Sequence, residues 1–391
     1  MKENQQVTAE IISVGKVIID ILKAKVAGGV YSLPADVDFT RLYSLANMHR
    51  VAPLIADAVI NCAFAPDDVK AKFKKELFKV SMRYESQMKE KDALIQIFNE
   101  KGIKYCFLKG HKLSRFYPNP EQRFMLDMDV WVEESRIADA QIVLEERGYE
   151  SVSNGYDKDI GYIKMPFLNI EIHKELKYDY DKGYEYYKGA FSRLEGKEGS
   201  CELNMTNEDF YVYILSHSAH HFETAGTGIR NILDHFYLKR NLKPVCDEVL
   251  LEDGFDATGL SIFNRKMDSL SEYWFGDGEK TEDIEELSNY ILLSGVFGNR
   301  TNHYLGGIVR GDYGSKKSEF IFTRLFPKKE KILDKYPILD KMPFLLPIIW
   351  IVRILTAIFT KVDYKSEIES VESVSEEEKS IFADFIKKNG L

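Results

Sequence analysis

The sequence predicts an α+β fold in which a small mixed-sheet core is embedded between N- and C-terminal helical regions. Apolar residues recur at helical spacing before residue 104 and again after residue 178. Between these limits the apolar residues form short runs or alternate with polar ones, as β-strands do. We therefore divide the chain into a helical region (1–103), an α/β core (104–178) and a second helical region (179–391).

Composition limits the classes of function. The chain has 391 residues, 45% of them hydrophobic, which argues against disorder and allows two or three domains. Its 53 Lys and Arg and 62 Asp and Glu leave a net charge of −9. A broad surface that coats nucleic acid needs clustered basic residues, so this class is excluded. A small basic or metal-lined pocket remains compatible with the composition.

The cysteines and the N-terminus indicate the compartment. The four cysteines are far apart and form no Cys-x-x-Cys pair: Cys62, Cys106, Cys201 and Cys246. This spacing predicts neither a zinc ribbon nor a disulfide framework. Glu10 and Asp20 interrupt the apolar residues of segment 1–25, which favours an amphipathic helix over an export signal. We expect a cytoplasmic protein with reduced thiols.

The N-terminal region is expected to consist of helices that support the core. Two apolar stripes have helical spacing: Ile11, Ile12, Val17, Ile18, Ile21 and Leu22, and then Leu42, Leu45, Val51, Leu54, Ile55 and Val59. Segment 71–101 continues the pattern. No titratable cluster in this region suggests chemistry.

The central region is predicted to form a sheet. Segment 105–108 is a short apolar run that ends at a glycine turn, and segments 126–132 and 168–173 alternate between apolar and polar residues. Weaker strands are expected at 149–153 and 162–165.

Helices are expected before and after the later strands in the sequence. Ser135 offers an N-cap for a helix that runs to Arg147, with Gly148 at its C-terminal stop. Segments 210–222 and 229–240 have helical periodicity and are separated by Gly226 and Gly228.

The tail contains an apolar segment, 344–359. Arg353 lies near its middle, at a cost of roughly 2.5–3.5 kcal/mol at a bilayer centre, and Pro347 weakens a spanning helix. We therefore expect no transmembrane span. Packing in the protein core is favoured, and contact with a membrane surface or a partner is the alternative. The acidic run 366–379 is expected to be a solvated surface segment.

Two carboxylates are the first candidates for chemistry. Asp127 and Asp129 lie two residues apart on a predicted strand and therefore share a face, while Met128 between them points into the core. Adjacent carboxylates repel each other, and a divalent cation such as Mg²⁺ relieves this repulsion while it keeps positions open for phosphate oxygens.

Nearby residues strengthen this interpretation. Gly110 follows the first strand and allows backbone N–H groups to approach a phosphate, and Lys109 adds a positive charge. Glu171, on the polar side of another strand, offers a third carboxylate. Three acids beside a glycine turn indicate metal-dependent phosphoryl transfer.

The motifs resemble a known protein family. They are Phe107-Leu-Lys-Gly110, Phe116-Tyr-Pro118, Arg123, Asp127-Met-Asp129-Val-Trp-Val132, Ile170-Glu-Ile-His173, His217-Ser-Ala-His-His221, Gly228-Ile-Arg230 and Asp234. Together with the tail from Phe326 to Arg353, they are similar to a bacterial family of uncharacterised nucleotidyltransferases of the DNA polymerase β-like superfamily. The resemblance implies Mg²⁺-dependent transfer of a nucleoside monophosphate from an NTP, with ATP the expected donor, to a hydroxyl or phosphate of an acceptor.

The resemblance also implies the roles of the three acids. Asp127, Asp129 and Glu171 would be the catalytic residues and would hold two Mg²⁺ ions. The acceptor is left open between a small molecule, a peptide and a tRNA, and the acidic surface favours a small one.

By the same resemblance, Gly110 begins a helix that holds the β- and γ-phosphates. Superfamily members usually have Gly-Gly or Gly-Ser at this turn, whereas this chain has His111 next, with Ser114 one turn later. Lys109 and Arg123 are therefore further candidates for phosphate binding. His173 shares the face of Glu171 and is expected to orient its carboxylate or contact a phosphate.

A histidine cluster leaves two further functions open. His217 and His221 share a helix face, with His220 beside them, and could form a zinc site with Asp234 or His173. That set would make the chain a zinc-dependent hydrolase. Alternatively, the histidines line the acceptor pocket or make hydrogen bonds within a helical subdomain. Arg230 and Asp234 are four residues apart and are expected to form an ion pair. A non-catalytic nucleotide-binding module is the remaining alternative.

Overall fold

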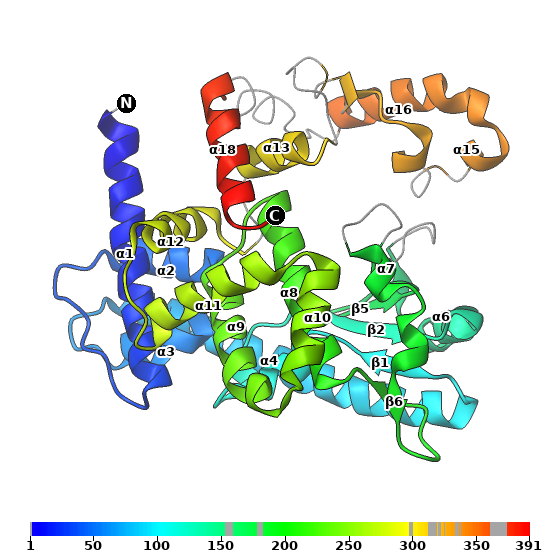
Figure 1. Cartoon of the computed structure of the whole chain (residues 1–391), viewed down its shortest axis with the longest axis horizontal. Helices are drawn as coiled ribbons and strands as arrows, with labels where there is room; N and C mark the ends of the chain where they lie inside the picture. The colour runs from blue at the N-terminus through cyan, green and yellow to red at the C-terminus, as the bar shows by residue number, and fades with distance from the viewer. Residues whose placement is uncertain are drawn as a thin grey trace.

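Helices surround a small mixed sheet in the computed structural model, which confirms the predicted α+β class (Figure 1). The structure describes residues 2–152, 159–177, 183–296, 300–311, 319, 322–323, 325–332, 336, 338–359 and 374–391. The four cysteines are free, as expected.

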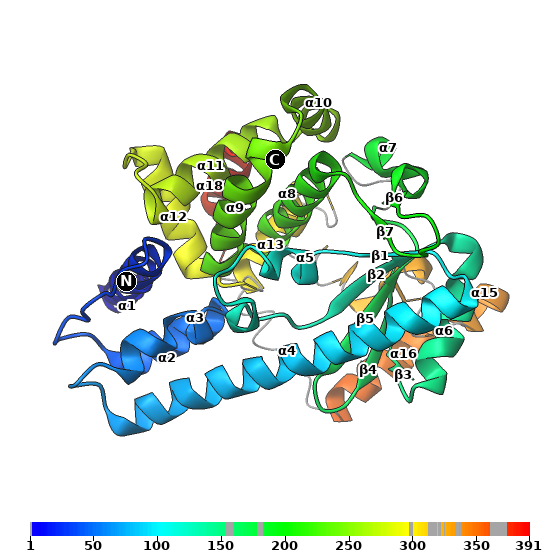
Figure 2. The same cartoon turned by 90° about the horizontal axis from the view of Figure 1, so that it is seen from below.

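Four helices form the N-terminal region: α1 (Lys2–Val26), α2 (Phe39–Met48), α3 (Ala52–Ile60) and α4 (Asp67–Lys101). The second predicted stripe is buried throughout, and Ile18, Ile21 and Leu22 of the first are buried in the same core. The 35-residue helix α4 packs on α2 and α3 and then continues along the sheet (Figure 2).

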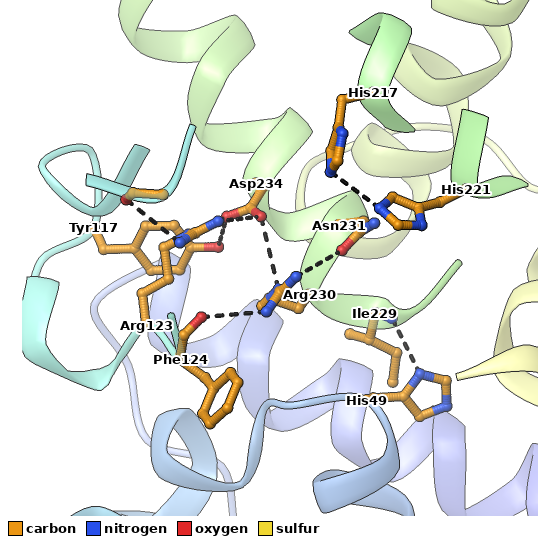
Figure 3. Close-up of polar contacts among 11 residues, drawn as sticks. His49, Tyr117, Arg123, Phe124, His217, His221, Ile229, Arg230, Asn231 and Asp234 are labelled. Carbon is orange, nitrogen blue, oxygen red and sulfur yellow. Dashed lines mark hydrogen bonds and ion pairs between the residues drawn. The ribbon is translucent and has the colours of Figure 1, made fainter. Parts of the chain in front are cut away.

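His49 joins this region to the C-terminal helices. Its ring Nε2 donates to the carbonyl oxygen of Leu292 (3.1 Å), and its Nδ1 accepts from the backbone N–H of Ile229 (3.2 Å; Figure 3). Burial lowers the pKa of His49 from 6.5 to about 4. The ring is therefore neutral in the folded protein at neutral pH.

This buried ring makes the stability of the protein depend on pH. Between pH 6.5 and about 4 the unfolded chain takes up a proton at His49 and the folded chain does not. We expect His49 to reduce the free energy of unfolding by roughly 3 kcal/mol as the pH falls through this range. Chemical denaturation of the parent and of His49→Gln at several pH values measures the effect. An equal pH dependence in both proteins would contradict it.

The sheet contains five strands: β1 (Tyr105–Phe107), β2 (Met128–Val132), β3 (Glu150–Ser151), β4 (Asp159–Lys164) and β5 (Leu168–His173). Their order is β1-β2-β5-β4-β3, and β2 and β5 are parallel while the other neighbours are antiparallel. Strand β2 begins at Met128 rather than at residue 126, and β4 begins before residue 162. Ser153, at the end of the predicted strand 149–153, lies outside the described residues.

Both faces of the sheet are covered. One face packs on α4 and α6 through Met128, Val130, Ile170 and Ile172. Cys106 and Trp131 point to the other face and pack with the C-terminal helices. Because side chains alternate along β2, Asp129 lies on the side of these helices.

The helix after β2 begins later than expected. Residues Glu134–Arg136 form a 3-10 turn (η2), and α6 spans Ile137–Glu146 without a side-chain N-cap. The Arg136 guanidinium donates to the carbonyl oxygens of Lys101 and Gly102, which ties this turn to the end of α4. The predicted Ser135 cap is therefore wrong. Gly148 ends the segment with a φ of 81°, a left-handed conformation that glycine adopts without strain.

Short elements surround the sheet: α5 (Gly110–Ser114), η1 (Pro120–Gln122), α7 (Tyr184–Tyr187), η3 (Ala190–Arg193), β6 (Glu195–Gly196) and β7 (Leu203–Asn204). The larger C-terminal elements are α8 (Asn207–Thr224), α9 (Ile229–Leu242), η4 (Lys243–Val245), α10 (Glu248–Thr258), α11 (Ser261–Phe275), α12 (Glu282–Ser294), α13 (Arg300–Val309) and α18 (Glu376–Lys388). Helix α1 packs against α11 and α12, so the two helical regions share one core.

The described part of the tail forms η5 (Lys329–Ile332), α15 (Ile338–Lys341), η6 (Pro343–Leu345) and α16 (Leu346–Phe359). The expectation that 344–359 packs in the core is wrong, because Phe344, Ile348, Ile351 and Leu355 are exposed. No helix in the described part of the chain is long and apolar enough to cross a membrane. Of the acidic run, residues 366–373 lie outside the described residues, and Ser375 caps α18.

Candidate active site

Three carboxylates come together where β2 and β5 lie side by side. Asp129 is in register with Glu171 on the parallel neighbour strand, and Asp127 directly precedes β2. The three residues line a pocket of about 250 Å³ together with Lys109 and Gly110. Residues of α8 and α9 form its opposite wall.

Asp129 is the most constrained of the three. Its side chain is 3% exposed, and its Oδ1 accepts from Lys109 Nζ and from His173 Nε2, each at 2.8 Å. Burial alone would raise its pKa, but the charge of Lys109 and the hydrogen bond from His173 hold the pKa of Asp129 below its usual value. Asp129 is therefore ionised and fixed in position.

His173 contacts carboxylates with both ring nitrogens. Nε2 donates to Asp129, and Nδ1 lies 2.5 Å from Asp159 Oδ1. Burial opposes the charged ring, but the contacts with the Asp129 and Asp159 carboxylates raise the pKa of His173 to about 9. The ring is therefore an imidazolium that orients Asp129. Its distance to the nearer oxygen of Glu171 is 3.9 Å, so the carboxylate that it orients is not the expected one.

Asp127 and Glu171 are repelled by the neighbouring carboxylates. Partial burial and the charge of Asp129 raise the pKa of Asp127. Glu171 is 38% exposed, and burial together with the charges of Asp129 and Asp127 raises its pKa to about 7. A cation would remove this repulsion. Among the described residues, Asp129, Glu171 and His173 form a group whose possible ligand atoms lie within 4.8 Å of one another.

The chemistry of these donors favours a hard cation. Both nitrogens of His173 are engaged by carboxylates, which leaves the oxygens of Asp127, Asp129 and Glu171 as the available ligands. Mg²⁺ prefers oxygen ligands.

Lys109 forms the turn before α5, and Gly110, His111 and Ser114 lie in α5. Lys109 adopts a positive φ of 40°, which is uncommon for a side chain with a Cβ. A Cβ at Gly110 would lie 2.7 Å from Met125 Sδ, so a larger residue here would require the Met125 side chain to move. His111 accepts from Lys91 and Arg115, and Ser114 donates to the carbonyl oxygen of His111.

Neither His111 nor Ser114 is among the residues that line the pocket. Burial and the neighbouring cations lower the pKa of His111 to about 3, so its ring is neutral.

Arg123 lines the pocket, but its guanidinium is held by Asp234. Its Nε and Nη2 donate to the two carboxylate oxygens at 2.6 and 2.8 Å, and Tyr117 donates to Oδ1 at 2.7 Å (Figure 3). This buried pair joins the segment before β2 to α9. Arg230 lies 3.9 Å from the same carboxylate and donates instead to the carbonyl oxygen of Phe124 at 3.2 Å.

Removal of one partner of this pair should destabilise the fold. We expect Asp234→Leu to reduce the free energy of unfolding by about 3–5 kcal/mol, because Arg123 would remain buried without its carboxylate. The double variant Arg123→Met/Asp234→Leu should recover most of the loss. Denaturant unfolding measures both variants, and a single variant as stable as the parent would contradict the assigned role.

The histidine cluster lies across the pocket from the acids. His217 and His221 contact each other through their Nε2 atoms at 3.0 Å (Figure 3). Burial, followed by the neighbouring His220 and Lys109, lowers the pKa of His221 to about 4. Asp234 is engaged by Arg123, and His173 by Asp129 and Asp159. His217, His221 and Asp234 line the same pocket, but among the described residues they form no group whose ligand atoms lie close enough together to hold a metal ion.

Three arginines at the site were not expected to take part in it. The Arg50 and Arg83 guanidiniums lie over the ring of Phe124, at 4.7 and 5.3 Å, and Arg230 donates to its backbone. The charge of Asp127 acts on both Arg83 and Arg230, although burial lowers the pKa of each. Arg50 and Arg83 come from the helical region that had suggested no chemistry, and only the fold brings them here.

The model of a family described as uncharacterised nucleotidyltransferase matches residues 35–276. The matched segment runs from the residues before α2 to the end of α11 and contains every residue of the pocket described above except Val296. No curated protein matches the chain.

Proposed function

This chain belongs to the family of uncharacterised nucleotidyltransferases, and from that premise we propose that it transfers a nucleoside monophosphate from an NTP to an acceptor in a Mg²⁺-dependent reaction. The observation that carries the proposal is the convergence of Asp127, Asp129 and Glu171 from β2 and β5 in one pocket with Lys109. ATP is the proposed donor. A hydroxyl or phosphate of a small molecule, a peptide or a tRNA is the proposed acceptor.

The three acids fit the metal that this reaction uses. Their donors are oxygens. Burial and then the neighbouring carboxylates raise the pKa values of Asp127 and Glu171, and a cation would offset this negative charge. The chemistry that two Mg²⁺ ions supply at such a site is activation of the acceptor hydroxyl and stabilisation of the departing pyrophosphate. His173 and Lys109 fix the Asp129 carboxylate from the protein side.

Positive charge beside the acids supports a triphosphate subsite. Lys109 and Arg230 line the pocket. Arg50 and Arg83 add positive charge over the ring of Phe124, another residue of the pocket. Arg230 makes neutral contacts with Phe124 and Asn231, and its closest carboxylate oxygen is 3.9 Å away. We therefore assign Arg230 to the phosphates of the nucleotide, where a charged hydrogen bond would replace its distant ion pair.

Replacement of Arg230 should weaken nucleotide binding. A hydrogen bond to a charged group contributes about 1.5–3 kcal/mol, so we expect Arg230→Gln to raise the KM for NTP about 10–100-fold, with a smaller change in kcat. Arg240→Gln, on the same helix but over the ring of Phe236, is the matched control. Steady-state kinetics or NTP titration measures the change. An unaltered KM in Arg230→Gln would exclude this role.

The activity itself is tested with α-labelled NTP, Mg²⁺ and panels of the three acceptor classes. We expect label on one acceptor class and an equal amount of pyrophosphate, and neither product when Mg²⁺ is chelated. NTP binding without pyrophosphate release on every panel would instead indicate a nucleotide-binding module. One tightly bound zinc per chain would indicate the hydrolase.

A further inference from the structure

Helix α16 presents an apolar stripe to solvent. Ile348, Ile351, Val352 and Leu355 are exposed and follow the spacing i, i+3, i+4, i+7, which places them on one face of the helix. Phe344 extends the apolar surface before the helix begins and is 73% exposed. An exposed apolar stripe of this kind is typical of a surface that contacts another protein or a membrane.

The opposite side of α16 is anchored to its own segment. Trp350 Nε1 donates to the carbonyl oxygen of Pro327 at 3.0 Å, and the Trp350 ring lies against Phe326 with a centroid distance of 5.4 Å. Phe326 in turn contacts Phe322. Figure 1 shows α15 and α16 at the edge of the molecule. The helix is thus held by one face while the stripe remains uncovered.

The length of α16 excludes a span but suits the surface of a bilayer. Its 14 residues extend for about 21 Å, which is shorter than the roughly 30 Å of a hydrocarbon core. An apolar helix face can lie in the acyl boundary while polar groups stay at the headgroups. Within α16 only Arg353 and Thr356 are polar, so most of the positive charge comes from the segment around the helix.

The charge of the segment around α16 favours an anionic membrane over a second copy of the chain as the contact. Residues 324–361 contain eight Lys and Arg but only three Asp and Glu, in a chain whose net charge is −9. Lys328 and Lys341 are exposed. A local excess of basic residues beside an apolar helix is complementary to anionic lipid headgroups. It would repel a second copy of the same segment.

We propose that α16 docks on the surface of a membrane that contains anionic lipids. The stripe of Ile348, Ile351, Val352 and Leu355 enters the acyl boundary, and the exposed residues Lys328 and Lys341 contact the headgroups. The surface is separate from the carboxylates of the pocket, so the proposal does not depend on the proposed function.

Sedimentation of the full chain with vesicles tests the proposal. One set of vesicles is pure phosphatidylcholine, and the other contains about one third phosphatidylserine. We expect binding to the anionic vesicles, weaker binding to the neutral ones and a loss of binding as salt rises. Ile351→Asp should reduce the bound fraction at least tenfold. Ile381→Asp, at an isoleucine of α18 with the same 59% exposure, should bind like the parent.

The thermal transition of each variant serves as the control for folding. Absence of binding by the parent, or equal binding of Ile351→Asp and the parent, would overturn the proposal. Self-association of the parent in sedimentation velocity that is abolished by Ile351→Asp, without vesicle binding, would assign the stripe to a second copy instead.

Discussion

Glu171→Gln and Asp127→Asn are each expected to lower nucleotidyl transfer by on the order of 10³-fold while the protein remains folded. Loss of a carboxylate that holds a catalytic cation removes several kcal/mol of charge stabilisation, and each 1.36 kcal/mol corresponds to a tenfold change in rate. Pyrophosphate release with the identified acceptor measures the loss.

The same variants should not destabilise the metal-free protein. The pKa of Glu171 rises from 4.5 to about 7 on folding, so the folded state loses stability as the pH rises through this range. Above pH 7 without metal, Glu171→Gln should therefore unfold at the same temperature as the parent or at a higher one. A lower unfolding temperature than that of the parent would show that a variant has lost activity because it has unfolded.

Glu150→Gln is the matched control for the chemistry. Glu150 is an exposed acid on β3 of the same sheet, away from the pocket. It should leave the transfer rate unchanged. Full activity of Glu171→Gln or Asp127→Asn would contradict the assignment of the acids.

Mg²⁺ affinity should rise steeply with pH up to about 7. Metal binding requires Glu171 to be ionised, and its pKa of about 7 means that protons compete with the metal below that value. We expect the Mg²⁺ concentration at half-saturation to increase up to tenfold for each pH unit below 7 and to level off above it.

Thermal shift titrations with Mg²⁺ at pH 6, 7 and 8 measure this dependence without an acceptor. Glu171→Gln should bind Mg²⁺ more weakly and lose the part of the pH dependence that comes from Glu171. An affinity that is independent of pH in the parent would show that Glu171 is not a ligand.

Local patterns predicted much of the sheet and the candidate acids. Alternation in segment 126–132 placed Asp127 and Asp129 on one face, because the side-chain period of a strand is two. The same rule selected Glu171. The sequence could not show that β2 and β5 are adjacent and in register, since strand order depends on contacts between distant residues.

Tertiary contacts also account for features that local patterns did not predict. Ser135 is a good N-cap by residue type, but Arg136 ties its turn to the end of α4. Arg123 lines the pocket as a candidate phosphate ligand, but the sequence could not show that Asp234, more than one hundred residues later, binds its guanidinium. Arg83 lies on α4, for which the sequence suggested only a supporting role. Because α4 runs along the sheet, the Arg83 guanidinium donates to the carbonyl oxygen of Leu126, next to Asp127.

The most direct test of the central claim is a crystal structure with a non-hydrolysable NTP and Mn²⁺, in which anomalous scattering locates the metal. We predict metal bound by the oxygens of Asp127, Asp129 and Glu171, with the phosphates of the nucleotide beside Lys109 and Arg230. Metal at His217 and His221, or a nucleotide bound away from the three acids, would contradict the account.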